Sequence, residues 1–151
     1  MAFVATISRQ RMIPSRAEAI WSILADFGAL SSWVDGIAHS SLLHHGAEGP
    51  LGTSRRVQAG RLTLVETITA FDPPTTLAYE IEGLPTMVSA ASNRWTLSPC
   101  GHATDVMVTS TYSVAGPLSA PAGWIVRRAM AKTSDDLLAG LAQRMESPDA
   151  R

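Results

Sequence analysis

The 151-residue sequence has a single cysteine, Cys100, and no excess of charge of either sign. One cysteine excludes an internal disulfide bond and a cysteine-rich zinc site. Twelve Lys and Arg residues stand against thirteen Asp and Glu residues, for a net charge of -1. Domains that bind the phosphate backbone usually carry a basic excess, so this balance argues against a nucleic-acid partner.

Long apolar runs are also missing, since none approaches the roughly 18 residues that a membrane-spanning helix requires. The segment from Met1 to Arg11 lacks the basic and then apolar pattern of a signal peptide. Charged residues make up 17% and hydrophobic residues 46% of the chain, which is typical of a packed globular domain. We therefore expect one cytoplasmic domain over residues 1–151, as a monomer or homodimer without a membrane span.

Several motifs of cofactor and metal chemistry are absent. The sequence has no Gly-x-Gly-x-x-Gly, no Walker loop and no Gly-x-Ser-x-Gly elbow. The four histidines, at 39, 44, 45 and 102, show no His-x-His or Glu-x-x-His spacing, and the adjacent His44 and His45 point apart. We expect neither a metal nor an organic cofactor.

Hydrophobic periodicity begins with a strand and then changes to helices. Residues 3–12 alternate between apolar and polar types and end before Pro14, which predicts a first strand. Ser15 lies three residues before Glu18, the spacing of a capping box, and this predicts a helix that starts there. A second short helix is predicted from Gly28 to Trp33.

The rest of the chain is predicted to form six strands followed by a long helix. Short turns rich in Gly and Pro separate the strands, which favours an antiparallel meander. The predicted strands are 37–44, 52–59, 61–71, 76–82, 87–97 and 104–115. After Gly116-Pro117 the period becomes helical as far as Ser147, and the apolar stripe comprises Trp124, Met130, Leu137, Leu138, Leu141 and Met145.

This order of elements predicts an α+β fold in which a curved, seven-stranded antiparallel sheet surrounds the long C-terminal helix. Two short helices follow the first strand. A sheet that curls around a helix cannot contact it along its whole length, so a cavity is expected between the two. Such cavities usually hold an apolar ligand.

The element order and several motifs resemble the START-like helix-grip superfamily, also called SRPBCC. The motifs are Ala17-Glu18-Ala19-Ile20-Trp21, Asp26-Phe27 leading to Trp33, Leu64-Val65-Glu66-Thr67-Ile68 before Asp72-Pro73-Pro74, and Arg94-Trp95-Thr96-Leu97. The resemblance covers the whole chain and is nearest to the bacterial polyketide cyclase/dehydrase branch. It implies the helix-grip fold but no particular reaction, because the superfamily contains catalysts, carriers and receptors.

Strand alternation assigns the inward faces and leaves few polar side chains on them. On 87–97 the inward set starts with Met87 and Ser89, and on 61–71 it includes Ala70. Arg55 faces inward if Val57 does. The other inward polar residues are Glu66, Tyr79, Asn93, Ser110 and Tyr112.

Glu66 is the most informative of these residues. A carboxylate among apolar neighbours requires a cation or hydrogen-bond donors, and Arg55 lies on the adjacent predicted strand. Two interpretations stay open: a structural ion pair or strand-end side chain, and an acceptor or general base for a ligand. The resemblance adds that the matching strand position lines the ligand pocket in the hormone receptors of the superfamily.

Other candidates also have two interpretations. Trp33 is either a core aromatic or a wall of the pocket, and the tyrosines bond either to the backbone or to a ligand carbonyl. His39 is a candidate acid or base if Ile37 faces the cavity. The predicted catalytic residues are Glu66, Tyr79, Arg55 and His39. The predicted ligand-binding residues are Trp33, Ile37, Val57, Ile68, Ala91, Asn93, Trp95, Ser110, Tyr112, Met130 and Ser134.

Two functions compete at this point, and both have a hydrophobic small molecule as the partner. One is an enzyme that promotes cyclisation, dehydration or aromatisation of a poly-carbonyl substrate, which requires a dry cavity, donors and one base. The other is a non-catalytic carrier or receptor of a lipid or other hydrophobic ligand. A protein-interaction module ranks last, because it requires a large exposed apolar patch that the sequence does not indicate.

Overall fold

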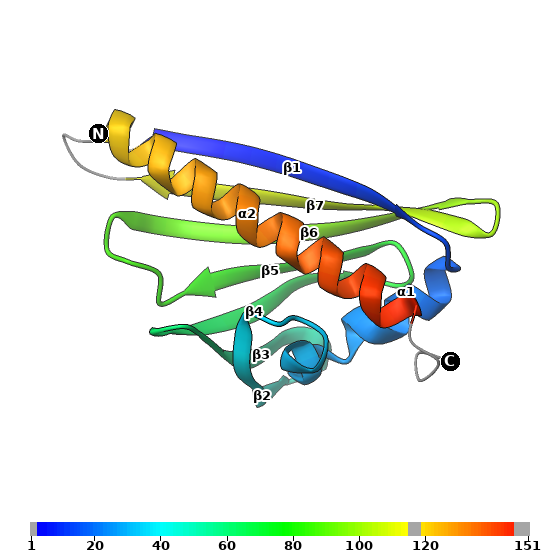
Figure 1. The fold of residues 1–151 in the computed structure, drawn as a ribbon. Coiled ribbons are helices and arrows are strands. Elements are labelled where there is room, and N and C mark those ends of the chain that lie inside the picture. Colours follow the sequence, from blue (N-terminus) through cyan, green and yellow to red (C-terminus); the bar gives the residue numbers. More distant parts are fainter. Residues whose placement is uncertain (1–2, 115–118, 147–151) are drawn as a thin grey trace.

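The structure, a computed structural model, describes residues 3–114 and 119–146. A curved sheet of seven antiparallel strands partly encloses one long helix (Figure 1). The strands are β1 (Phe3–Ile13), β2 (Ile37–Gly46), β3 (Gly49–Ala59), β4 (Leu62–Asp72), β5 (Thr76–Glu82), β6 (Val88–Cys100) and β7 (Ala103–Val114). The helices are α1 (Ala17–Ala25), the 3-10 helix η1 (Phe27–Ser32) and α2 (Ser119–Glu146). The predicted α+β helix-grip class is confirmed.

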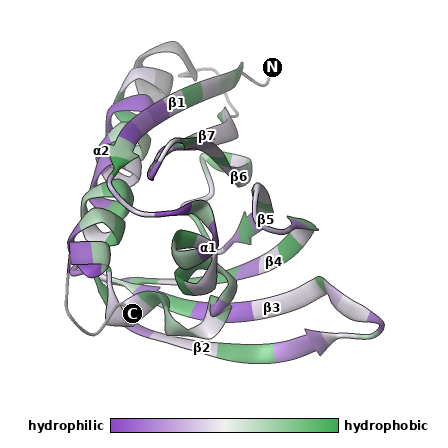
Figure 2. Cartoon of the chain, turned by 90° about the vertical axis from the view of Figure 1, so that its right-hand side faces the viewer, coloured by the Kyte–Doolittle hydropathy of each residue, from purple (hydrophilic) through white to green (hydrophobic). Residues whose placement is uncertain are grey.

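The strand order is β1-β7-β6-β5-β4-β3-β2. From β2 to β7 each strand pairs with the next one in the chain, as a meander requires. The first strand instead pairs with the last, from Phe3 opposite Val114 to Ile13 opposite Thr104. Figure 2 shows how the sheet bends from β1 round to β2 with α2 beside it.

Side-chain burial alternates along β7 as the sequence predicts. The inward residues Val106, Val108, Ser110, Tyr112 and Val114 are all at most 2% exposed, while their neighbours are half-buried. One face of this strand is therefore fully covered.

The start of β6 corrects one predicted face. Met87 precedes the strand and is 45% exposed, and Ser89 is exposed as well. The pairing of β6 with β7 shifts register between Val88 and Ala90, so the inward face begins only at Ala91. A sequence pattern with a strict period of two does not contain such a shift.

A bulge in β4 corrects a second face. The pairing of β4 with β5 shifts between Ile68 and Ala70, and Phe71 then lies opposite the buried Leu77. Phe71, and not Ala70, packs against the core, with its ring centroid 5.1 Å from that of Trp21.

The predicted capping box at Ser15 is wrong, although the helix that it predicted is present. The N-cap of α1 is Arg16, and no side chain caps the helix. Ser15 lies in the preceding turn, where its amide donates to the Ile13 carbonyl at 2.8 Å and its carbonyl accepts a 2.7 Å hydrogen bond from Thr104. The buried residues of α1 are Ala17, Ile20, Trp21 and Leu24, as the spacing predicts.

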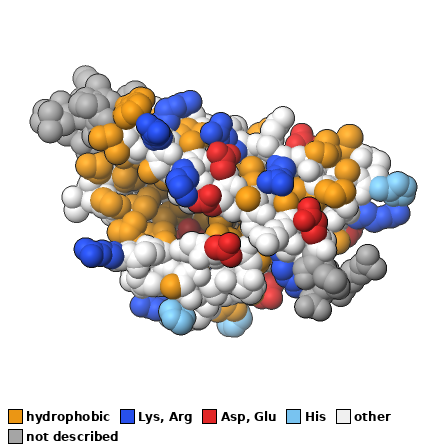
Figure 3. Space-filling model, in the orientation of Figure 1, with side chains coloured by type: hydrophobic (Ala, Val, Ile, Leu, Met, Phe, Trp, Pro, Cys, Tyr) orange, Lys and Arg blue, Asp and Glu red, His pale blue; other side chains and the backbone are white. Residues whose placement is uncertain are grey.

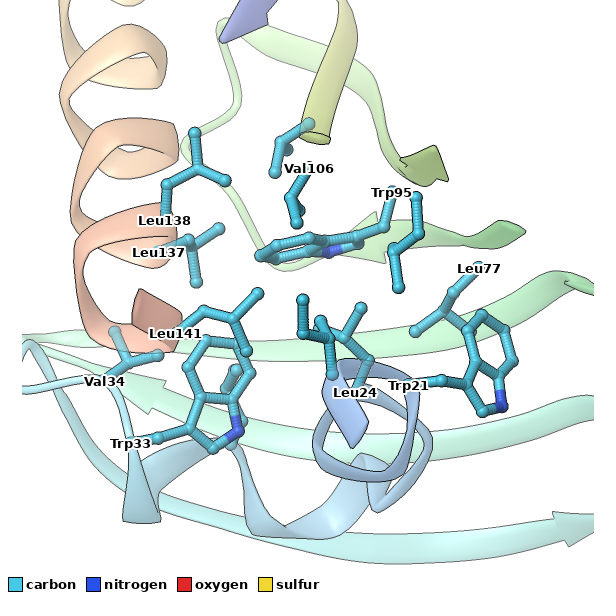
Figure 4. Close-up of a cluster of buried hydrophobic side chains, with 14 of the residues drawn as sticks. Trp21, Leu24, Trp33, Val34, Leu77, Trp95, Val106, Leu137, Leu138 and Leu141 are labelled. Atoms are coloured by element: carbon cyan, nitrogen blue, oxygen red, sulfur yellow. The ribbon is translucent and has the colours of Figure 1, made fainter. Parts of the chain in front are cut away.

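The C-terminal half of α2 closes the core. Leu137, Leu138 and Leu141 pack near Trp33 and Trp95 (Figure 4). Trp124 is 63% exposed, so its predicted place in the apolar stripe is wrong. No helix in the described part of the chain combines the length and hydropathy needed to cross a bilayer.

Candidate functional site

A cavity of about 140 Å³ lies between the sheet and the middle of α2. Figure 3 shows a hollow lined with hydrophobic side chains beside α2. An engineered protein cavity of about 150 Å³ holds one benzene molecule, so this cavity has room for about one six-membered ring. Its apolar walls are Leu30, Ile37, Val57, Ala59, Leu62, Leu64, Ile81, Leu84, Met130 and Leu137.

Five polar residues form a row across the inner face of the sheet, which we call the polar belt. It consists of Arg55 on β3, Glu66 on β4, Tyr79 on β5, Asn93 on β6 and Ser110 on β7. Arg55 is the direct cross-strand partner of Glu66, and Asn93 is the direct partner of both Tyr79 and Ser110. All five side chains are buried. One inward polar residue on each of five adjacent strands therefore places polar groups inside an apolar core, with an offset between β4 and β5, where Glu66 lies opposite Ile81.

Arg55 and Glu66 form a buried ion pair. The Nε and Nη2 atoms of Arg55 each lie 2.7 Å from Oε1 of Glu66, and Nη1 donates to the Phe27 carbonyl at 2.8 Å. The guanidinium carbon lies 3.8 Å from the ring centroid of Phe27 and 4.8 Å from that of Tyr79. The cation thus compensates the carboxylate charge and itself packs against the rings of Phe27 and Tyr79.

The two oxygens of Glu66 have different surroundings. Oε1 accepts the hydrogen bond from Arg55 Nε and makes the ion-pair contact with Nη2, whereas no donor in the described segments bonds to Oε2. Glu66 contributes to the cavity wall, but Arg55 does not. Glu66 is therefore the member of the pair that can accept a hydrogen bond or a proton from a ligand.

Tyr79 is the centre of a second polar group. Its hydroxyl accepts hydrogen bonds from Asn93 Nδ2 at 3.3 Å and from Trp95 Nε1 at 3.2 Å. Ser110 Oγ donates to Asn93 Oδ1 at 2.6 Å, and Ser134 Oγ on α2 lies 3.3 Å from Ser110 Oγ. Burial raises the pKa of Tyr79 above its ordinary value of 10.0, and the nearby Glu66 carboxylate raises it further. Tyr79 is consequently a neutral phenol at physiological pH.

The raised pKa of Tyr79 predicts a loss of stability in alkali. The folded state holds the phenol proton more tightly than the unfolded state, so this stabilisation is complete below pH 10.0 and declines as the pH rises further. Urea unfolding at about pH 8 and about pH 11 measures the decline. We expect a smaller decline in Tyr79→Phe than in the wild type. Burial also raises the pKa of Tyr112, so Tyr112→Phe is compared in the same way to separate the contributions of the two tyrosines. A decline in Tyr79→Phe that equals the wild-type decline would contradict the assignment to Tyr79.

Many of the predicted site residues line the cavity. From the sheet these are Ile37, Val57, Glu66, Tyr79, Asn93 and Ser110, and from α2 they are Met130 and Ser134. They come together because inward positions on adjacent strands face one segment of α2, from Met130 to Leu137.

The structure places the remaining aromatic and aliphatic candidates elsewhere. Trp33, Trp95 and Ile68 belong to the main core, where the ring centroids of Trp33 and Trp95 lie 6.1 Å apart. Ala91 and Tyr112 do not line the cavity; they belong to a second apolar cluster, against which the wall residues Ile81, Leu84 and Met130 pack. Trp33 is thus a core aromatic, the first of its two interpretations.

His39 and Arg55 also lie outside the cavity wall. His39 is exposed, because the pairing of β2 with β3 is irregular between Ile37 and His39 and ends the simple alternation. Arg55 is buried behind Glu66, Phe27 and Tyr79. The expectation that these two side chains act directly on a ligand is therefore not supported by their positions.

Sequence reasoning missed several wall residues. Thr133 and Leu137 follow Met130 by three and seven positions, so helical periodicity from Met130 was a usable signal for both. Leu30 lies on η1, Ala59 and Leu62 flank the β3–β4 turn, and Leu84 lies between β5 and β6. No periodic pattern applies to these positions. Within residues 3–114 and 119–146, no group of three or more His, Cys, Asp or Glu side chains is placed to hold a metal ion.

Comparisons with known proteins agree with this architecture. The family model described as "Polyketide cyclase / dehydrase and lipid transport" matches residues 4–146. No curated protein sequence matches the chain. A START superfamily protein from Mycobacterium smegmatis superposes with a TM-score of 0.78 and 20% identity, over 93% of this chain and 97% of that chain.

Two further solved structures are similar. The Zhui aromatase/cyclase from Streptomyces sp. R1128 has a TM-score of 0.74 and 17% identity, over 97% of this chain and 98% of its own. A protein from Thermus thermophilus has a TM-score of 0.78 and 21% identity, over 93% of this chain and 96% of its own. At these identities the structural matches establish the shared fold.

Proposed function

The chain belongs to the polyketide cyclase / dehydrase and lipid transport family, and from this membership we propose that it binds a small, largely apolar molecule with an oxygen function in the cavity under α2. The observation that carries the proposal is the chemistry of the cavity wall. Ten apolar residues surround a space in which Glu66 and Tyr79 present an acceptor and a phenol. Apolar walls with a few convergent polar groups are typical of small-molecule sites.

Filling the cavity is expected to abolish this binding. Ala59 lies on its wall, and Ala59→Phe places a ring in a space that holds about one ring. We expect the affinity for cyclohexanone, measured by calorimetry or ligand-observed NMR, to fall by at least about tenfold. Ala38→Phe is the matched control, because Ala38 is exposed on β2. Equal affinities in Ala59→Phe and the wild type would rule out this cavity as the binding site.

The acceptor and the phenol also support a chemical role, the cyclisation or dehydration of a carbonyl compound. Tyr79 donates a hydrogen bond to the carbonyl oxygen, and Glu66 Oε2 removes a proton from the adjacent carbon. The electron pair of that C–H bond forms the C=C bond of an enolate, whose oxygen Tyr79 stabilises. In cyclisation the enolate carbon attacks a second carbonyl group, the electron pair of that C=O π bond moves to its oxygen, and the resulting alkoxide takes the proton back from Glu66. In dehydration the enolate expels a β-hydroxyl, which leaves as water with the proton from Glu66.

Proton exchange in a simple ketone tests this chemistry separately from binding. Exchange of the α-protons of cyclohexanone in D₂O is slow without a catalyst and is followed by NMR. We expect the wild type to accelerate it and Glu66→Gln to lose about 10²-fold or more of that acceleration, the usual contribution of a general base. The glutamine keeps the shape of the side chain but cannot take the proton.

The alternative function, a carrier or receptor, makes a different prediction for the same samples. Such a protein binds cyclohexanone without accelerating exchange, and Glu66→Gln leaves the exchange rate unchanged. Native mass spectrometry of the purified protein adds a second readout, because an unmodified hydrophobic molecule that copurifies supports carriage over catalysis.

A further inference from the structure

We propose, building on the function proposed above, that Asn93, Ser110 and Ser134 are positioning residues that fix the Tyr79 hydroxyl as a hydrogen-bond donor toward the ligand. The cavity then selects a ligand with an acceptor atom at this point. The ligand is selected by a chain of hydrogen bonds that starts on α2 and ends on β5, because the donor-to-acceptor direction of this chain leaves the Tyr79 hydroxyl as a donor.

The bond between Ser110 and Asn93 sets the direction of the chain. Its length of 2.6 Å is that of an O–H···O bond, whereas N–H···O bonds are mostly near 2.9–3.0 Å. The oxygen of the Asn93 amide therefore faces Ser110, and its NH₂ group faces Tyr79. The 3.3 Å contact from Asn93 Nδ2 to the Tyr79 hydroxyl agrees with this orientation.

Ser134 extends the chain to the helix. A serine hydroxyl has one proton, and Ser110 uses its proton on Asn93. The 3.3 Å contact between the two serine oxygens is then a hydrogen bond that Ser134 donates and Ser110 accepts. Ser134 is 1% exposed and Ser110 is 2% exposed, so bulk water does not compete for these bonds.

The Tyr79 hydroxyl accepts hydrogen bonds from two groups that can act only as donors. An indole N–H can only donate, and the amide NH₂ of Asn93 also donates, so Trp95 and Asn93 occupy the acceptor capacity of the phenol oxygen. No acceptor for the phenol proton is found in the described segments. Because Tyr79 lines the cavity, the remaining proton is available to a ligand there.

A one-atom change at position 93 tests this arrangement. Asn93→Asp replaces the donor NH₂ with an acceptor oxygen, to which Tyr79 then donates its proton. The probes are cyclohexanone and methylenecyclohexane, which have similar shapes but differ in the acceptor oxygen. We expect the wild type to bind cyclohexanone about tenfold more tightly, the upper range for one neutral hydrogen bond, and Asn93→Asp to lose that preference.

Two further variants separate positioning from folding. Ser110→Ala removes the donor that orients Asn93 and introduces no charge, so we expect it to reduce the preference for the ketone in the same direction. Ser98→Asp is the matched control, because Ser98 is exposed on the same strand, β6. Infrared spectra of bound cyclohexanone add a direct readout: the C=O stretch is lowered by the Tyr79 hydrogen bond in the wild type, and this shift is lost in Asn93→Asp.

The outcomes are distinct. If Asn93→Asp and Ser110→Ala both keep the wild-type preference and the C=O shift, the positioning role is wrong while ligand binding in the cavity stands. If the wild type binds neither probe, the proposed function fails, and the positioning role fails with it.

Discussion

Replacing Arg55 with methionine is expected to lower the free energy of unfolding by about 3–5 kcal/mol, the usual effect of breaking a buried ion pair from one side. Arg55 is 3% exposed and Glu66 is 5% exposed, so bulk water does not compensate for the missing cation. The variant leaves the carboxylate without its two 2.7 Å contacts and the Phe27 carbonyl without its donor. Urea denaturation at neutral pH measures the difference.

Two controls separate the ion pair from general effects of the substitution. Arg56→Met changes the adjacent residue, which is exposed on the same strand, and we expect it to alter stability by less than about 0.5 kcal/mol. The double variant Arg55→Met/Glu66→Met should recover most of the loss, because an apolar pair can replace a buried ion pair at little cost. If Arg55→Met proves as stable as Arg56→Met, the pair does not hold this part of the core.

The second large effect concerns Gly140 on α2. Alanine in place of glycine inside a helix usually stabilises a protein by about 1 kcal/mol. Here a methyl group on Gly140 would overlap the carbonyl oxygen of Trp33 and approach Cα of Val34 to 3.4 Å. Backbone atoms cannot move aside as a flexible side chain can, so we expect Gly140→Ala to destabilise the protein by about 1–3 kcal/mol.

The sign of the change is the decisive result for Gly140. Ala139 is the exposed neighbour on α2, and Ala139→Gly should lose only about 1 kcal/mol through helix propensity. Gly140→Ala should also weaken cyclohexanone binding, because the helix that carries Met130 and Ser134 must move away from the sheet. A Gly140→Ala protein more stable than the wild type would contradict the close approach of the two backbones.

The polar belt was predictable from sequence because strand geometry has a fixed period. Glu66, Tyr79, Asn93 and Ser110 fall on inward positions of their strands, and Arg55 follows from Val57. The alternation of side chains along a strand shows which face of the sheet a residue occupies. The pairing of Arg55 with Glu66 could then be predicted from the adjacency of their two strands. Local pattern and global fold agree at these positions.

Departures from regular pairing were not predictable. The register shifts at Ile68/Ala70 and at Val88/Ala90 each move a side chain off its expected face. His39 is exposed beyond a similar irregularity in β2. A bulge inserts a residue without a distinct sequence signature. A sequence pattern of period two therefore continues through the bulge, whereas the alternation of side chains in the structure does not.

The exact extent of the cavity was also beyond sequence reasoning, although its place between the sheet and the C-terminal helix was predicted. Trp33 fills the core beside Trp95, whereas Ala59 and Leu84, near turns, leave room under α2. Which part of an interior is filled depends on how closely two elements approach, and the approach of α2 is set by the contact between Gly140 and the Trp33 carbonyl. Such long-range packing produces no periodic sequence pattern among the residues that line the cavity.

The pairing of β1 with β7 has a consequence for folding of the chain during its synthesis on the ribosome. β1 leaves the exit tunnel before the other strands, but its partner β7 does not begin until Ala103. The hairpins from β2 to β7 close over short loops as they are synthesised, whereas joining Phe3 to Val114 closes most of the chain at once. β1, which is translated before the other strands, is thus among the last to pair, and until then the edge of β7 stays open to other nascent chains.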